Sequence, residues 1–174
     1  KSVLAEGRSK TLSKPDLKPS DVAFLQYTGG TTGVSKGATL MHSNLVANML
    51  QNEAWLQPAM TNMPANADHV IITALPLYHI FALTVCCLMG WRLGAMCVLI
   101  PNPRDIPGFV KELAKYKFTV FPGLNTLFNG LLNTPGFDKL DFSHMKVSNG
   151  GGMATQKSVA ERWLKVTGCP VIEG

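Results

Sequence analysis

The chain has 174 residues, of which 46% are hydrophobic and 16% are charged. This composition is typical of a folded domain with a sizeable core, and it excludes a disordered tail. The formal net charge is +5, but the sequence contains no run of five or more like charges, so we do not expect a nucleic-acid partner.

Residues 1–20 differ in composition from the rest of the chain. They hold five of the 16 basic residues and two prolines, with little apolar periodicity. We interpret them as a basic, solvent-exposed leader or linker, and residues 21–174 as part of one α/β subdomain. Because the chain starts without Met and stops after the apolar residues 169–174, we expect a fragment of a larger protein; a tagless mature protein is the alternative.

Strand-like and helix-like segments alternate after residue 20. Ser43, Asp105 and Thr155 each precede a segment with apolar residues at helical spacing, so we expect them as N-caps, and Gly168 ends the last helix. In chain order, we expect strands at residues 21–27, 36–42, 69–76, 95–101, 118–123, 145–152 and 169–174, and helices at residues 43–55, 79–94, 105–113, 124–132 and 155–168.

Most of the expected strands are continuously apolar, and helices separate them. This pattern predicts an α/β fold with a mostly parallel, doubly wound sheet and helices on both faces. Ligands of such sheets bind at the carboxyl ends of the strands. Two glycine clusters, within residues 29–37 and 150–152, follow expected strands, so we expect a binding site there.

The cysteines and histidines do not form a recognisable metal site. None of the four cysteines belongs to a C-x-x-C pair, and no two histidines have metal-ligand spacing. We expect buried thiols of a reducing compartment. The longest apolar stretch, Ile80–Trp91, is shorter than the ~20 residues that span a bilayer.

Residues 27–38 read YTGGTTGVSKGA and combine four glycines with three threonines, one serine and one lysine. Glycine lets backbone N–H groups approach an anion, and the hydroxyls and Lys36 add donors and charge, so this stretch predicts a phosphate site. It is not a Walker A loop, because Ser35 and Gly37 stand where a glycine and a hydroxyl belong. The absence of G-x-G-x-x-G also excludes a Rossmann fingerprint.

A longer motif fits better. Residues 27–38, followed by TLMHSN, closely resemble the phosphate loop of the AMP-forming acyl-activating enzymes, the superfamily of acyl-CoA synthetases, luciferases and peptide-synthetase adenylation domains. ALPLYHIFALT (residues 74–84) resembles a second signature of that superfamily. VSNGGGM (residues 147–153) resembles its adenine-side glycine segment, and VIEG the residues before its YG-x-TE stretch.

The resemblance covers nearly the whole chain from Asp21 onward and implies part of a larger N-terminal domain. FPGLNTLFNGLLN and AERWLKVTG look most like bacterial long-chain fatty-acid–CoA ligases. Ser43 departs from the pattern, since many relatives have a basic residue between the His and Asn of H-x-N. We interpret this difference as neutral for catalysis.

The resemblance implies an ATP-dependent long-chain fatty-acid–CoA ligase, of which this chain would be a piece without activity of its own. In that family a carboxylate attacks the α-phosphorus of Mg-ATP, giving acyl-AMP and pyrophosphate, and coenzyme A then displaces AMP. The alternatives are an amino-acid adenylation domain, a fatty-acyl-AMP ligase, or a non-catalytic nucleotide-binding module.

The resemblance also implies roles for individual residues. His79 and Lys36 would be catalytic residues, and His79 would lie near the acyl carboxylate; a packed histidine that caps a helix is the alternative for His79. The glycines Gly150, Gly151 and Gly152 would let the backbone approach the adenine. The β- and γ-phosphates would be held by Thr28, Gly29, Gly30, Thr31, Thr32, Gly33 and Lys36.

The implied partners are a long-chain fatty acid, ATP and coenzyme A. The Mg²⁺ ligands are expected beyond Gly174, so no metal ligand is assigned within the chain. The apolar helix residues, among them Phe81, Phe128 and Leu131, fit either an acyl tunnel or the core. We expect a cytoplasmic enzyme, and leave open peripheral association with the inner face of the cell membrane and a homodimer.

Overall fold

The computed structural model describes residues 2–27, 35–61, 63 and 68–174. They form two compact units, Lys1–Val46 and Ala47–Gly174, and each is described by itself. The boundary that we predict at residue 20 is a different division, and it stays a prediction.

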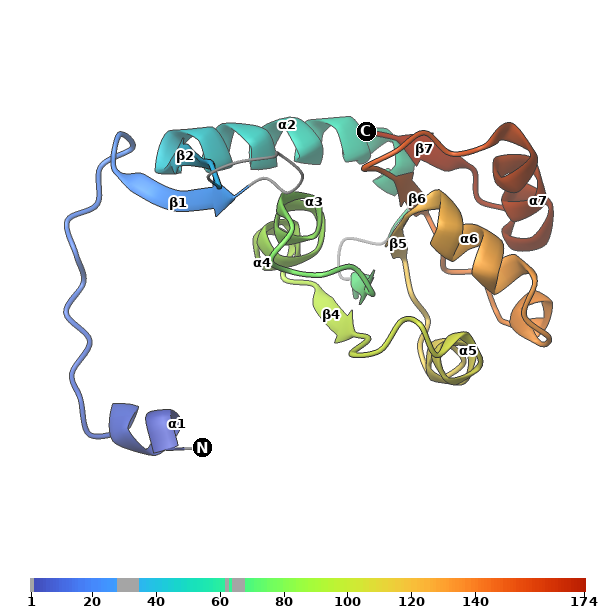
Figure 1. Ribbon diagram of the computed structural model, residues 1–174, viewed down its shortest axis with the longest axis horizontal. Helices are drawn as coiled ribbons and strands as arrows, with labels where there is room; N and C mark the ends of the chain where they lie inside the picture. The colour runs from blue at the N-terminus through green and yellow to red at the C-terminus, as the bar shows by residue number, and fades with distance from the viewer. Residues whose placement is uncertain (1, 28–34, 62, 64–67) are drawn as a thin grey trace. The chain divides into compact units, whose positions relative to one another are not determined.

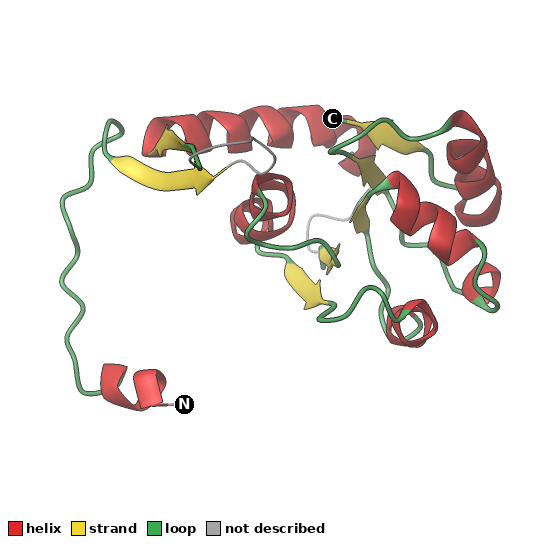
Figure 2. Ribbon diagram, in the orientation of Figure 1, coloured by secondary structure: helices red, strands yellow, loops and turns green. Residues whose placement is uncertain are grey.

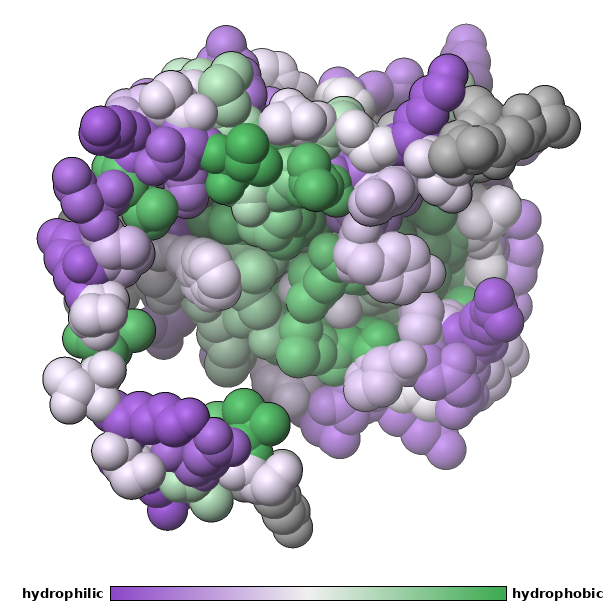
Figure 3. Space-filling view, turned by 60° about the vertical axis from the view of Figure 1, so that its left-hand side comes forward, coloured by the Kyte–Doolittle hydropathy of each residue, from purple (hydrophilic) through white to green (hydrophobic). Residues whose placement is uncertain are grey.

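The first unit contains helix α1 (Ser2–Gly7) and the antiparallel strands β1 (Val22–Tyr27) and β2 (Gly37–Met41). All described residues of the leader are exposed, as predicted, and Figure 3 shows both hydrophilic and hydrophobic side chains on this part of the chain. The helix itself was not predicted. An ion pair of 2.6 Å between Lys10 and Glu6 follows its last turn, and such local pairs stabilise short helices weakly.

The sheet of the second unit has five parallel strands in the spatial order β4-β3-β5-β6-β7 (Figures 1 and 2). Each lies within a segment that the sequence predicts as a strand, and each is shorter than its predicted segment. The strands are β3 (Val70–Thr73), β4 (Met96–Leu99), β5 (Val120–Gly123), β6 (Val147–Gly150) and β7 (Val171–Glu173).

Apolar clusters cover both faces of this sheet, which confirms the predicted doubly wound α/β fold. On one face Phe121 packs with Phe128 and Trp163 of the helices, whereas on the other face Val120 packs with Leu56 and Met89. The helices are α2 (His42–Met60), α3 (Ile80–Ala82), the π-helix η1 (Leu83–Leu88), α4 (Met89–Leu93), α5 (Ile106–Leu113), α6 (Asn125–Leu132), the 3-10 helix η2 (Phe137–Lys139) and α7 (Lys157–Thr167).

Two of the predicted helix ends are confirmed. The Asp105 carboxylate accepts a hydrogen bond from the Gly108 backbone N–H at 3.0 Å, as an N-cap does. Gly168 has a φ of 72° and donates its N–H to the Leu164 carbonyl, which ends α7 in a left-handed turn.

The other two predicted caps are wrong. Helix α2 begins one residue before Ser43, and Asn44 supplies the local acceptor instead, since its Oδ1 receives the Met41 N–H at 2.9 Å. The N-cap of α7 is Gln156, without a side-chain cap bond, and Thr155 lies one residue outside. A short polar side chain also forms turns, so its presence near a helix does not locate the cap.

The helix predicted over residues 79–94 is divided into α3, η1 and α4. Thr84 lies in the π-helical part, and its hydroxyl donates to the Ile80 carbonyl at 2.8 Å. A side-chain hydroxyl of this kind donates to backbone carbonyls that the altered hydrogen-bond pattern of a π-helix leaves without an N–H partner. In the described part of the chain, no helix has the length and apolar character of a membrane span.

Trp163 is the largest fully buried side chain, and its Nε1–H donates to the Ser148 hydroxyl at 2.8 Å. We expect Trp163→Ala to lower the free energy of unfolding by about 3–5 kcal/mol, because a large cavity forms and a buried donor pair is lost. Chemical denaturation of the full-length protein measures this loss. Lys165→Ala on the same helix is the control, expected within about 0.5 kcal/mol of wild type; equal effects would contradict the assigned core.

Burial raises the pKa of the Cys86 thiol from 9.0 to about 12, because the thiolate would lose its hydration. The unfolded thiol ionises first, so the contribution of Cys86 to stability is full below pH 9.0 and declines as the pH rises towards 12. We expect the free energy of unfolding to fall more steeply in wild type than in Cys86→Ala above pH 9.0, by up to about 1.4 kcal/mol per pH unit. Parallel curves for the two proteins would refute this.

Candidate active site

His79 follows β3 after a short turn and is the N-cap of α3, with its backbone extended at φ −88° and ψ 135°. Its Nδ1 accepts a hydrogen bond from the Phe81 backbone N–H at 3.2 Å. In the neutral imidazole the other nitrogen, Nε2, then carries the proton and is a donor. His79 therefore caps a helix, as its alternative role requires, but its side chain is exposed; its catalytic role stays a prediction.

A cavity of about 310 Å³ brings His79 together with the second glycine cluster. Segments far apart in the sequence meet here, namely the turn after β3, the start of the following helix, and the residues after β5 and β6. Apart from His79 and Gly152, its walls are almost entirely apolar. The lining residues are Leu75, Pro76, Tyr78, His79, Phe81, Ala82, Leu124, Gly152 and Met153.

Neighbouring side chains approach the backbone of the predicted glycines so closely that a larger residue would not fit. A Cβ on Gly151 would lie 2.6 Å from the Phe81 ring, and a Cβ on Gly150 would lie 2.6 Å from the Thr155 hydroxyl. Gly152 has a φ of 76°, a conformation that favours glycine. Gly151 thus lets the helix after His79 pack directly against the chain after β6, and Gly150 lets Thr155 approach the end of that strand.

Hydrogen bonds from three neighbouring elements hold this segment. The Gly151 N–H donates to the Gly123 carbonyl at 3.3 Å, at the end of β5. Further along, the Glu173 carboxylate accepts from the Thr155 N–H, and Asn125 Oδ1 accepts from the Gln156 N–H at 2.9 Å. The chain after β6 is therefore ordered by side chains from β7 and α6.

The first glycine cluster is only partly described. Residues 28–33, the predicted phosphate-binding residues other than Lys36, lie outside the described residues. Lys36 belongs to the first unit, immediately before β2, and is exposed. Its predicted role in phosphate binding stays a prediction.

Several residues at this site were missed or left open by the sequence. Phe81 lines the cavity, whereas Phe128 and Leu131 are completely buried in the core, which decides between the two roles that the sequence left open for them. Asn125 and Glu173 had no assigned role. Only their positions could have indicated a role in the site, because each is a polar residue next to the carboxyl end of an expected strand.

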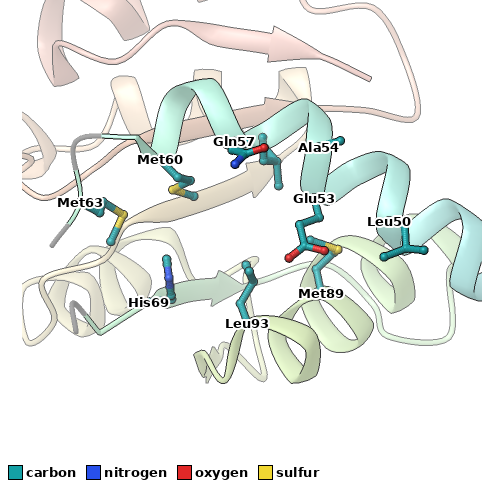
Figure 4. A pocket seen from close by; sticks show the side chains of 10 residues that line it. Leu50, Glu53, Ala54, Gln57, Met60, Met63, His69, Met89 and Leu93 are labelled. Atoms are coloured by element: carbon teal, nitrogen blue, oxygen red, sulfur yellow. The ribbon is translucent and has the colours of Figure 1, made fainter. Parts of the chain in front are cut away.

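A second cavity, of about 390 Å³, lies at the amino end of β3, among α2, β3 and α4 (Figure 4). Methionine and leucine side chains line much of it, together with Glu53 and His69. Glu53 is paired with the Arg92 guanidinium at 3.0 Å. This cavity contains none of the predicted site residues, and it lies at the edge of the sheet opposite to where ligands of parallel sheets bind.

The described ranges contain no group of three or more His, Cys, Asp or Glu side chains that could hold a metal ion. The four cysteines are free thiols, and burial raises the pKa of Cys86, Cys97 and Cys169. Raised values make these thiols weak ligands and nucleophiles. The chemistry of the site therefore rests on His79, backbone N–H groups and apolar walls.

The model of the AMP-binding enzyme family matches residues 2–174. A long-chain-fatty-acid–CoA ligase of Escherichia coli O6:H1 is 55% identical over the whole chain, and one of Bacillus subtilis is 34% identical over 99% of it. The chain spans 30% of the length of either relative.

Solved structures agree with these relatives. The crystal structure of ATP-bound MatB from Rhodopseudomonas palustris superposes with a TM-score of 0.77 at 30% identity, over 99% of this chain and 32% of that one. The crystal structure of apo MatB from the same organism superposes with a TM-score of 0.78 at 28% identity. Because the family match covers residues 2–174, this chain belongs to the family of AMP-binding enzymes.

Proposed function

We propose that the full-length protein containing this chain is an ATP-dependent long-chain-fatty-acid–CoA ligase. The observation that carries the proposal is identity of 51–55% over the entire chain to curated ligases of that name from Haemophilus influenzae and Escherichia coli. A 4-coumarate–CoA ligase of Nicotiana tabacum, named for an aromatic acid, is only 30% identical over 92% of the chain. The difference favours a fatty acid over an aromatic one.

The proposed reaction has two steps. A carboxylate oxygen of the fatty acid forms a bond to the α-phosphorus of ATP, and the bond from that phosphorus to pyrophosphate breaks. The thiol sulfur of coenzyme A then attacks the acyl carbonyl carbon, the bond to AMP breaks, and the thiol proton is released. Both steps depend mainly on positioning and charge stabilisation, because the leaving groups are already good.

We propose the following roles for residues of the site within this scheme. His79 uses Nδ1 for the cap bond, so its Nε2–H is the group that can donate to a carboxylate oxygen and orient it. The apolar cavity beside it suits the first carbons of an acyl chain. The backbone of Gly150, Gly151 and Gly152 would face the adenine, and Lys36 with residues 28–33 the β- and γ-phosphates.

The proposal includes ATP and coenzyme A as co-substrates and Mg²⁺ as the ion that accompanies ATP. The described residues do not supply a set of metal ligands, so no step is assigned to Mg²⁺ here. Four free thiols favour a reducing compartment, and the proposal accordingly places the enzyme in the cytoplasm. Peripheral membrane association and a homodimer stay predictions.

Pyrophosphate exchange into ATP tests the adenylation step. We expect exchange by the full-length protein that depends on long-chain fatty acids, and a loss of about a hundredfold in Lys36→Ala, because a positive charge is removed from the developing pyrophosphate. Lys14→Ala, in the exposed leader, is the matched control and should behave as wild type. Exchange with amino acids only would indicate an adenylation domain, and ATP binding without any exchange would indicate a non-catalytic module.

Two substitutions separate the two roles of His79. Asparagine is a good N-cap and alanine is a poor one, but neither side chain reproduces the Nε2–H of histidine. We expect both His79→Asn and His79→Ala to lower fatty-acid-dependent exchange, by about tenfold or more, since donors at reacting groups contribute at least that much. Normal exchange by His79→Asn would show that capping is the only role of His79. Thermal unfolding of both variants is the control, because it measures how much stability each variant loses when the cap changes.

A further inference from the structure

We infer that a basic cavity at the amino end of the sheet binds the phosphate group of an amphiphile, a molecule that joins a phosphate to an apolar chain. The cavity has a volume of about 530 Å³, which is within the range of small-molecule sites. The described residues that line it include none of those assigned to the proposed reaction. The inference therefore goes beyond that reaction and does not depend on it.

The first residues of the parallel strands surround this cavity. Val70 begins β3 and Met96 begins β4, whereas Thr119 and Lys146 directly precede β5 and β6. The Thr119 hydroxyl accepts from the Val70 N–H at 2.9 Å and donates to the Val70 carbonyl at 3.1 Å. The Thr119 carbonyl accepts from the Lys146 N–H at 2.8 Å. These bonds fix the backbone on which Lys146 is carried, at the end of the sheet opposite to His79.

Three ammonium groups line the cavity, and they come from two connections of the chain. Lys115 and Lys117 lie between α5 and β5, and Lys146 precedes β6. Lys115 is paired with the Glu112 carboxylate. Among the described residues, no ion pair includes Lys117 or Lys146. Two cations therefore line one cavity without a direct counter-charge, and both are available to an anion.

The acidic groups nearby do not cancel the positive charge of the cavity wall. Asp68 lines the cavity and offsets one of its three ammonium charges. Neither Glu112 nor Asp141 belongs to the described lining. The pKa of the Asp141 carboxyl is lowered, chiefly by hydrogen bonds from Ser143 and in smaller part by His144 and Lys117. A ligand inside the cavity would thus meet more ammonium groups than carboxylates.

The lining combines donors with apolar side chains, which indicates the class of ligand. A phosphate has up to two negative charges and three free oxygens, so it can accept from Lys117, Lys146 and His144 together. A carboxylate has only one charge and two oxygens. Val70 and the half-exposed Met96 add apolar surface to the same cavity. A phosphate joined to an apolar chain matches both parts of the lining.

Titration of the full-length protein with dihexanoyl phosphatidic acid, a water-soluble amphiphile, tests the site. We expect Lys117→Ala/Lys146→Ala to raise the Kd about tenfold or more, because two charge-assisted contacts are lost. Lys117→Arg/Lys146→Arg keeps both charges and should stay within about threefold of wild type. Lys111→Ala/Lys139→Ala removes the same charge from exposed positions outside the cavity and should stay within about twofold. Equal Kd values for the two alanine variants would overturn the site.

Two further ligands separate recognition of the phosphate from recognition of the chain. Inorganic phosphate lacks the apolar chain, and the choline of dihexanoyl phosphatidylcholine offsets the phosphate charge. We expect both to bind about tenfold more weakly than phosphatidic acid, or weaker still. Equal affinity for inorganic phosphate would overturn the requirement for an amphiphile. Equal affinity for phosphatidylcholine would overturn recognition of an anionic phosphate.

Reductive methylation of lysines, followed by mass spectrometry, locates the ligand without any substitution. Dihexanoyl phosphatidic acid should slow the labelling of Lys117 and Lys146 and leave that of Lys111 unchanged. Protection of Lys36 alone would place the lipid at the glycine-rich loop and would overturn the inference.

Co-sedimentation with vesicles distinguishes the two sources of such a ligand. Vesicles of phosphatidylcholine that contain phosphatidic acid present the phosphate at a membrane surface. Binding to them that is lost in Lys117→Ala/Lys146→Ala would support the site and identify a membrane phospholipid as its ligand. Vesicle binding that is absent, or unchanged in this variant, together with tight binding of the soluble lipid, would support the site and identify a free amphiphile.

Discussion

The site depends on the parallel register of β5 and β6, which sets Gly123 beside Gly150 at the carboxyl end of the sheet. A side chain at either position would collide with the structure around it. A Cβ on Gly123 would lie 2.7 Å from the Phe128 ring, and a Cβ on Gly150 would meet Thr155 and Val171. Because both positions lack a side chain, a buried aromatic ring and the returning chain can approach the strand ends closely.

This arrangement explains how a sheet with two apolar faces can present polar groups at a ligand site. The strand interiors are buried on both sides, so polar groups can face a ligand only beyond the strand ends. There the backbone no longer takes part in the hydrogen bonds between strands, and its N–H groups need other acceptors. Gly123, Asn125 and Glu173 supply them for Gly151, Gln156 and Thr155. The groups that satisfy the backbone thereby also fix the shape of the cavity beside His79.

His79 combines a structural and a chemical role for the same reason. A helix that starts at the edge of a site leaves backbone N–H groups without partners. The imidazole satisfies one of them with Nδ1, and this bond determines which nitrogen faces outward as a donor. Packing of Phe81 on Gly151 then locates that helix start relative to β6. The same local geometry therefore determines the helix cap, the tautomer of His79 and the position of Phe81 in the cavity wall.

Much of this protein could be predicted from its sequence. Continuous apolar strands separated by helices predicted the parallel α/β sheet, and the glycine-rich motifs predicted which family the chain belongs to. Helix ends were predictable where one residue suffices, as at Asp105 and Gly168, because their local hydrogen bonds or dihedral angles need no distant partner. Ser43 and Thr155 failed because polar side chains near a helix have several local alternatives.

Other features were decided only by tertiary structure. The spatial order of the strands, the contact of Phe81 with Gly151 and the bond from Glu173 to Thr155 join residues far apart in the chain. Apolar periodicity indicates that a side chain is buried, but it does not identify the side chain opposite. For that reason Phe128 and Phe81 looked alike in sequence, although one belongs to the core and the other to the cavity. The sequence by itself determined the family, the fold class and the chemical groups available, because these follow from local pattern and composition. The tertiary structure determined which of those groups meet, because that depends on strand register and packing.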